Sequence, residues 1–126
     1  MILGIGTDIV SLARMEIIYN KFPDVFPGKI LGDKELKIFD KITLSKQKIS
    51  YLSKRFAAKE AFVKALGTGF RKGIILSDVM VENDSLGKPQ IIISKKIAKL
   101  LPKDAKVFLS IADEIEMAIA FVVIEN

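Results

Sequence analysis

The 126-residue sequence contains no cysteine and no histidine. The absence of cysteine excludes a disulfide framework and any thiolate metal site. The absence of histidine removes the commonest general base and the commonest zinc ligand. A bound metal would therefore be held by carboxylates and other oxygens, which favours Mg²⁺ or a similar hard cation.

Long apolar runs, charge blocks and repeats are also missing from the chain. No run reaches the length of a transmembrane helix. The N-terminal stretch MILGIGTDIV lacks the basic start and the cleavage site of a signal peptide, so we expect a cytoplasmic protein. Half of the residues are hydrophobic, and the length predicts a single domain over residues 1–126.

A net charge of +5 favours an anionic partner such as a nucleic acid, a phosphorylated cofactor or an acidic protein. The same excess is also ordinary for a lysine-rich surface. The basic residues are spread along the chain, and no RNP-like aromatic motif, zinc finger or recognition helix is present. We therefore expect neither nucleic acid nor membrane as a partner.

Hydrophobic periodicity and turn residues predict the order β-α-α-α-β-β-α-β-β, an α+β domain with a mostly antiparallel sheet. The predicted elements are a strand at 2–10, helices at 12–19, 33–42 and 45–66, strands on either side of NDSLGKP, a helix at 94–101, and strands on either side of DEIE. Ser11, Asp33 and Ser45 are expected to cap the first three helices, and Gly67 to end the long one.

One carboxylate lies at the end of the first predicted strand. Alternate residues of a strand share a face, so Asp8 points the same way as Gly4 and Gly6. The two glycines leave room on that face for a close neighbour or a ligand. Alternatively, Asp8 caps the following helix or closes a turn.

A second carboxylate lies on the long predicted helix. At about 100° per residue, Glu60 falls within roughly 60° of Ile49, Phe56 and Val63, on an apolar face. A buried carboxylate is unfavourable unless it is paired. Its partner is either Lys64, four residues on, or a metal ion shared with another acid.

The loop GTGFRKG after this helix combines glycines with Arg71 and Lys72, a composition that suits an anion. It is neither a Walker A motif nor a Rossmann turn. Gly67 alternatively serves only as the helix C-cap. LGKP, further on, indicates a hairpin turn first and a ligand contact second.

Four stretches occur in one order: GIGTDIV, RFAAKEAFVKALGTGFRKG, NDSLGKPQI and LSIADE. Together they resemble, along the whole chain, the holo-[acyl-carrier-protein] synthases, a family of small bacterial 4′-phosphopantetheinyl transferases. The resemblance implies transfer of the phosphopantetheine arm of coenzyme A to a serine of apo-acyl carrier protein, for fatty acid biosynthesis. It also implies a sheet packed against a long central helix, and a homotrimer with sites between subunits.

The resemblance implies Mg²⁺ held by Asp8 and Glu60, with Lys64 near the reacting phosphate. Either Glu60 or a metal-bound water would take the serine proton. The residues implied to bind coenzyme A are Arg55, Lys64, Gly67, Thr68, Gly69, Gly87, Lys88 and Pro89.

The resemblance further implies that the acidic carrier protein docks on the first helix. Arg14 and Lys21 would supply charge, with Lys29 as a further candidate, and Ile18 and Phe22 would supply apolar contacts.

Many family members carry a histidine where this chain has Asp113, so the roles of Asp113 and Ser110 stay open. Two other functions also stay open from the residues alone. One is a nucleic-acid-binding module, and the other is a structural oligomer in which Glu60 pairs only with Lys64.

Overall fold

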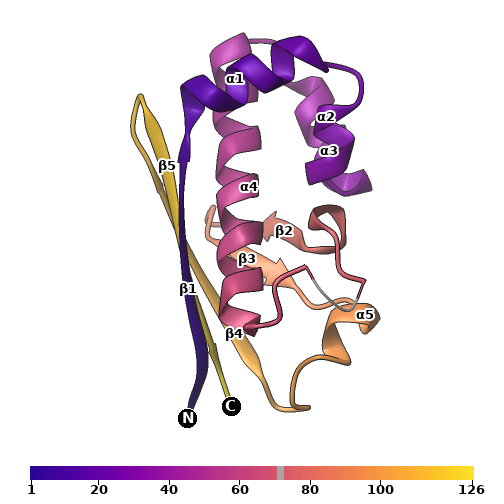
Figure 1. Cartoon of the computed structure of the whole chain (residues 1–126), viewed down its shortest axis with the longest axis vertical. Helices are drawn as coiled ribbons and strands as arrows, with labels where there is room; N and C mark the ends of the chain where they lie inside the picture. The colour runs from indigo at the N-terminus through magenta and orange to yellow at the C-terminus, as the bar shows by residue number, and fades with distance from the viewer. Residues whose placement is uncertain (71–72) are drawn as a thin grey trace.

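The computed structural model describes residues 1–70 and 73–126 (Figure 1). Its elements are β1 (Ile2–Ser11), α1 (Leu12–Lys21), α2 (Phe26–Ile30), α3 (Asp33–Lys41), α4 (Ser45–Leu66), a 3₁₀ turn η1 (Leu76–Asp78), β2 (Met80–Asn83), β3 (Pro89–Ile92), α5 (Lys95–Ala98), β4 (Lys106–Asp113) and β5 (Met117–Glu125). The described strand pairs are all antiparallel, in a β1-β5-β4 sheet and a β2-β3 hairpin. The predicted α+β class is confirmed.

The helix α2 is absent from the sequence-based prediction. The two prolines of KFPDVFPGK indicated a break, yet Pro27 lies in the first turn of a helix. Proline is tolerated there because the first amides of a helix have no partner within it. The predicted order therefore lacked one helix.

The predicted helix ends are partly right. The Ser11 hydroxyl accepts a hydrogen bond from Arg14 N at 3.3 Å, and Gly67 ends α4 at a φ of 75°. The caps predicted at Asp33 and Ser45 are wrong, because each of these residues is the first residue inside its helix.

The helix α4 runs beside β1, between the three-stranded sheet on one side and α2, α3 and the β2–β3 hairpin on the other (Figure 1). A Cβ at Gly4 would overlap the carbonyl oxygen of Ala65, and one at Gly6 would overlap that of Ala61. Only glycine permits this approach of strand and helix backbones. The room predicted beside Asp8 is thus filled by α4.

The two faces of the three-stranded sheet differ in exposure. The face toward α4 is buried through Val10, Leu109 and four residues of β5: Ala118, Ala120, Val122 and Ile124. The opposite face, here called the outer sheet face, carries apolar side chains that are 43% to 63% exposed: Ile5, Ile9, Phe108, Met117, Ile119 and Phe121. The sheet is therefore apolar on both sides.

Within residues 1–70 and 73–126, no helix is both long enough and apolar enough to cross a membrane.

We predict that Gly6→Ala lowers the free energy of unfolding by about 3 kcal/mol, because the added methyl group forces the backbones of β1 and α4 apart. Urea unfolding followed by circular dichroism measures the change. Gly28→Ala is the matched control, because nothing lies within 4 Å of the added Cβ. Equal stability of the two variants would contradict the close contact.

Candidate active site

The contact between β1 and α4 brings together Asp8, Glu60 and Lys64. Lys64 Nζ lies 3.0 Å from Asp8 Oδ1 and donates a hydrogen bond to Thr7 O at 2.9 Å. The Asp8 side chain is 15% exposed, whereas that of Lys64 is 54% exposed. The Asp8 carboxylate is therefore largely shielded from solvent, and the Lys64 ammonium group beside it is exposed. Asp8, Glu60 and Lys64 are together called the Asp8 site below.

Glu60 is half-buried and lies close enough to Asp8 for the two charges to interact. Burial and the neighbouring Asp8 carboxylate raise the pKa of Glu60, and Lys64 opposes them only in part. Among the described residues, Glu60 forms no ion pair, and Lys64 pairs with Asp8 instead. The alternative of a Glu60–Lys64 pair is therefore not what the structure shows.

Two adjacent carboxylates suit a hard divalent cation. Mg²⁺ is commonly held by one or two carboxylates, with substrate phosphates and waters completing its octahedron. Over the described parts of the chain, no cluster of three or more acidic, histidine or cysteine side chains is arranged to hold a metal. Asp8 and Glu60 therefore fit a metal that relies on the substrate for its other ligands, and not a closed structural site.

The glycine loop predicted to bind the cofactor begins directly after α4. Gly67 and Gly69 have φ values of 75° and 61°, and the Thr68 hydroxyl donates to Gly69 O at 3.1 Å. This loop starts three residues after Lys64, so it leaves the helix at the end that is close to the Asp8 site. Arg71 and Lys72 lie outside the described residues.

The second predicted loop is a tight hairpin turn between β2 and β3. Asp84 Oδ1 accepts hydrogen bonds from Leu86 N and Lys88 N, both at 2.9 Å. Gly87 has a φ of 84°, a conformation that favours glycine. The turn predicted from LGKP is confirmed, and Lys88 is exposed on it.

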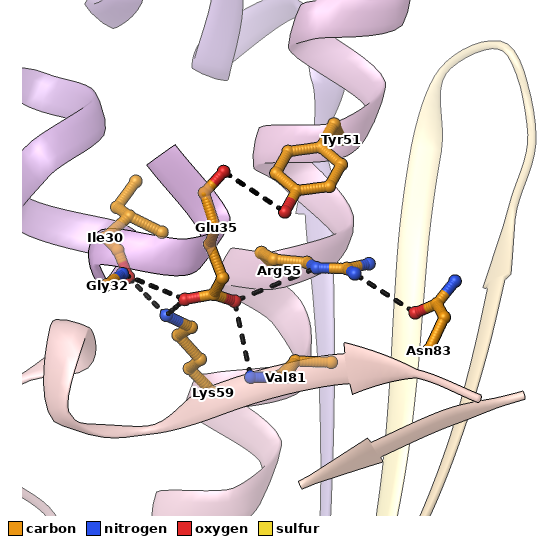
Figure 2. Close-up of polar contacts among 8 residues, drawn as sticks. All are labelled: Ile30, Gly32, Glu35, Tyr51, Arg55, Lys59, Val81 and Asn83. Carbon is orange, nitrogen blue, oxygen red and sulfur yellow. Dashed lines mark hydrogen bonds and ion pairs between the residues drawn. The ribbon is translucent and has the colours of Figure 1, made fainter. Parts of the chain in front are cut away.

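Arg55 differs in setting from the other predicted cofactor-binding residues, because it is 94% buried within a polar cluster (Figure 2). Its Nη2 donates to Asn83 Oδ1 at 3.0 Å, and its guanidinium lies 4.5 Å from the centre of the Tyr51 ring. Its Nε lies 3.8 Å from Glu35 Oε2. Arg55 thus connects α4 to the β2–β3 hairpin.

Glu35 and Lys59, which no sequence pattern indicated, complete this cluster. Lys59 is fully buried, and its Nζ lies 2.6 Å from Glu35 Oε1. Glu35 Oε1 also accepts from Gly32 N at 2.9 Å, at the start of α3. Glu35 lies three residues after the N-cap residue Gly32, and a glutamate at this position that bonds the N-cap amide is a capping signal. The cluster of Glu35, Arg55, Lys59 and Asn83 is called the Glu35 cluster below.

The predicted carrier-binding residues lie on an exposed face. Arg14 and Lys21 are exposed on α1 with Ile18, and Phe22 directly after the helix is 57% exposed. Ile17, which the sequence analysis did not select, is 58% exposed on the same helix. The exposed side of α1 therefore combines positive charge with apolar surface.

Asp113, at the end of β4, is exposed and accepts a hydrogen bond from the Ser50 hydroxyl at 3.3 Å. Ser110 is exposed on the outer sheet face, opposite Phe121 of β5.

Comparisons of the sequence and of the structure with known proteins both point to one family. The family model of the 4′-phosphopantetheinyl transferase superfamily matches residues 4–120. A holo-[acyl-carrier-protein] synthase of Wolbachia pipientis is 46% identical over 124 residues, which cover 98% of each chain.

Two solved structures are similar over nearly the whole fold. The holo-[acyl-carrier-protein] synthase of Neisseria meningitidis superposes with a TM-score of 0.90 at 43% identity, over 100% of both chains. A holo-(acyl-carrier-protein) synthase of Bacillus anthracis in complex with CoA (3′,5′-ADP) gives 0.84 at 38% identity, over 100% of this chain and 98% of the other. The expected fold is confirmed.

The raised pKa of Glu60 predicts how Glu60→Gln changes stability in metal-free buffer. The folded state holds the Glu60 proton more tightly than the unfolded state, whose ordinary pKa is 4.5. This contribution to stability is complete below that value and is lost as the pH rises through the raised folded-state pKa. We expect the variant to melt at a higher temperature than the wild type at neutral and mildly alkaline pH, with a difference that shrinks on acidification.

Differential scanning calorimetry in EDTA measures these melting temperatures, with Glu16→Gln on the exposed face of α1 as the control. A lower melting temperature for Glu60→Gln at neutral pH would show instead that a favourable ion pair stabilises Glu60.

Proposed function

The chain belongs to the 4′-phosphopantetheinyl transferase superfamily, and we propose that it transfers 4′-phosphopantetheine from coenzyme A to a serine of apo-acyl carrier protein. Adenosine 3′,5′-bisphosphate is the second product. Residues 1–126 act as one transferase domain, in the cytoplasm, in fatty acid biosynthesis. The observation that carries the proposal is the meeting of Asp8, Glu60 and Lys64 where β1 touches α4.

Asp8 and Glu60 are the proposed ligands of a Mg²⁺ ion. When bound, this ion would neutralise charge on the diphosphate of coenzyme A and help to align it with the attacking hydroxyl group. The two carboxylates lie close enough across the strand–helix contact for their charges to interact, so the fold brings both together before substrate arrives. The repulsion between them is relieved when a cation is present.

The reaction joins the serine oxygen to the β-phosphorus of coenzyme A and breaks the bond from that phosphorus to the bridging oxygen of the diphosphate. Lys64 is the exposed cation of the Asp8 site, and its flexible chain lets it turn from Asp8 toward the phosphate under attack. In a chain without histidine, Glu60 is the proposed acceptor of the serine proton.

Two loops supply the remaining proposed contacts to coenzyme A. Backbone amides of Thr68 and Gly69 are suited to phosphate oxygens. In the turn at residues 87–89 the amides of Gly87 and Lys88 already donate to Asp84, so the proposed contact there is the exposed ammonium group of Lys88. Arg55 is the remaining proposed coenzyme A ligand. It is buried beside the hairpin and bonded to Asn83.

The acidic carrier protein is proposed to dock on α1. Arg14 and Lys21 would steer it by charge, and Ile18 and Phe22 would provide the apolar contact. Lys29 on α2 is also exposed and extends the positive surface.

A homotrimer is proposed to form through the outer sheet face. Six apolar side chains on this face are exposed to solvent in a single chain, a pattern that marks an interaction surface. Burying them between subunits would also bring β1, which carries Asp8, close to the neighbouring subunit, in line with sites shared between subunits.

The transfer is tested by mass spectrometry of apo-acyl carrier protein incubated with this protein, coenzyme A and Mg²⁺. We expect a mass gain of one phosphopantetheine arm, which EDTA prevents. Asp8→Asn and Glu60→Gln should each slow the transfer by about 100-fold or more, because each removes a charge that the transition state needs.

Asp24→Asn is the matched control, because Asp24 is an exposed acid outside the Asp8 site. A mass gain that persists in EDTA, or full activity in a folded Asp8→Asn variant, would contradict the assigned metal site.

The trimer is tested by sedimentation of Phe121→Asp, which places a charge on the outer sheet face. We expect the wild type to sediment as a trimer and the variant as a smaller species with unchanged circular dichroism. Ile38→Asp is the control, because Ile38 is 52% exposed on α3 and lies outside that face. A monomeric wild type, or a variant that sediments like the wild type, would overturn this assembly.

A further inference from the structure

Three hydrogen-bond donors and the Arg55 guanidinium converge on one buried carboxylate, that of Glu35 (Figure 2). Oε1 accepts from Gly32 N at 2.9 Å and lies 2.6 Å from Lys59 Nζ. Oε2 accepts from Val81 N at 3.3 Å and lies 3.8 Å from Arg55 Nε. Glu35 is 1% exposed, so water does not compete for these groups. One side chain therefore connects α3, α4 and β2.

The cluster contains one acid and two buried cations. Burial lowers the pKa of Lys59, and the Glu35 carboxylate opposes that shift. Lys59 Nζ also donates to Ile30 O at 2.5 Å, at the end of α2. Lys59 directly precedes Glu60 on α4. The residue that bonds Glu35 and Ile30 is therefore adjacent in sequence to the residue whose charge interacts with Asp8.

The same cluster attaches β2 to α4 at two points. Glu35 bonds the backbone at Val81, and Arg55 bonds the side chain of Asn83, the last residue of the strand. Arg55 Nε is buried and has no hydrogen-bond partner among the described residues. The side-chain hydrogen bond of Arg55 is therefore the one from Nη2 to Asn83 Oδ1, and the Glu35 carboxylate attracts the guanidinium group by charge.

The turn that follows Asn83 is rigid within itself, because Asp84 Oδ1 accepts from both Leu86 N and Lys88 N. In the β2–β3 ladder, Asn83 stands opposite Pro89. The orientation of Gly87 and Lys88 relative to α4 therefore follows from where Asn83 is held.

We propose that Glu35 and Asn83 are positioning residues for coenzyme A: with Arg55 they fix the β2–β3 turn at the place where Gly87 and Lys88 meet the cofactor. This inference rests on the proposed function. Neither residue takes part in the chemical step, so their loss weakens cofactor binding and leaves the step itself intact.

Asn83→Ala is the sharpest test, because Asn83 is exposed and its removal leaves the buried charges paired. Steady-state transfer assays should give a KM for coenzyme A raised about fivefold, with kcat and the KM for carrier protein within about twofold of wild type. Hydrogen–deuterium exchange of residues 84–88 should become faster. Glu82→Gln is the matched control: it alters the adjacent residue of the same strand, whose ion pair with Lys34 is exposed.

Glu35→Gln tests the origin of the effect. The amide has nearly the same shape, but whichever way it turns, its NH₂ group faces donors instead of accepting from them. We expect a larger rise in the KM for coenzyme A, of about tenfold or more, and a lower melting temperature. If this variant does not fold, the test rests on Asn83→Ala.

The inference is overturned if Asn83→Ala keeps the wild-type KM and exchange rates, or if Glu82→Gln shows the same rise in KM. Calorimetry of the wild type and of Asn83→Ala with coenzyme A distinguishes failure of the positioning role from failure of the proposed function. If the wild type binds coenzyme A and Asn83→Ala binds it with the same affinity, only the positioning role is wrong. A wild type that neither binds nor transfers sinks the proposed function, and this inference with it.

Discussion

The rest of the structure depends on the direct contact between the backbones of β1 and α4. Gly4 and Gly6 lie against the carbonyl groups of Ala65 and Ala61, and any side chain in place of the glycines would separate strand and helix. Glycine in a strand gives up stability through its larger loss of conformational entropy. The contact in turn places Asp8, two residues after Gly6, beside the turn of α4 that carries Glu60 and Lys64.

Two carboxylates shielded from solvent, Glu35 packed against α4 and Glu60 on α4 itself, are stabilised in opposite ways. Glu35 is surrounded by donors from the protein, so its charge is stabilised within the fold. Glu60 has a second acid as its neighbour, and its pKa rises in consequence. A carboxylate left in this state by its own chain is suited to a cation from outside. The first arrangement stabilises the scaffold, and the second prepares a site for chemistry.

Much of this arrangement could be predicted from the sequence, because its signals are local. The strands around NDSLGKP and DEIE follow from turn residues, and the inward direction of Asp8 follows from the alternation of β1. The helix α2 was missed because a proline in a first turn looks like a helix break. The Glu35 cluster was missed because Glu35 and Lys59 are 24 residues apart, and no local periodicity reports such a pairing. Arg55 was expected to line the cofactor pocket, but its bond to Asn83 depends on how the hairpin packs.

The central claim is that the contact between β1 and α4 creates a metal site from Asp8 and Glu60. A crystal structure of the protein with coenzyme A and Mn²⁺, with anomalous diffraction recorded at the manganese edge, tests it most directly. The account predicts an anomalous peak within coordination distance of both carboxylates and of the cofactor diphosphate. A manganese ion bound elsewhere, with Lys64 still paired to Asp8 beside a bound cofactor, would contradict it.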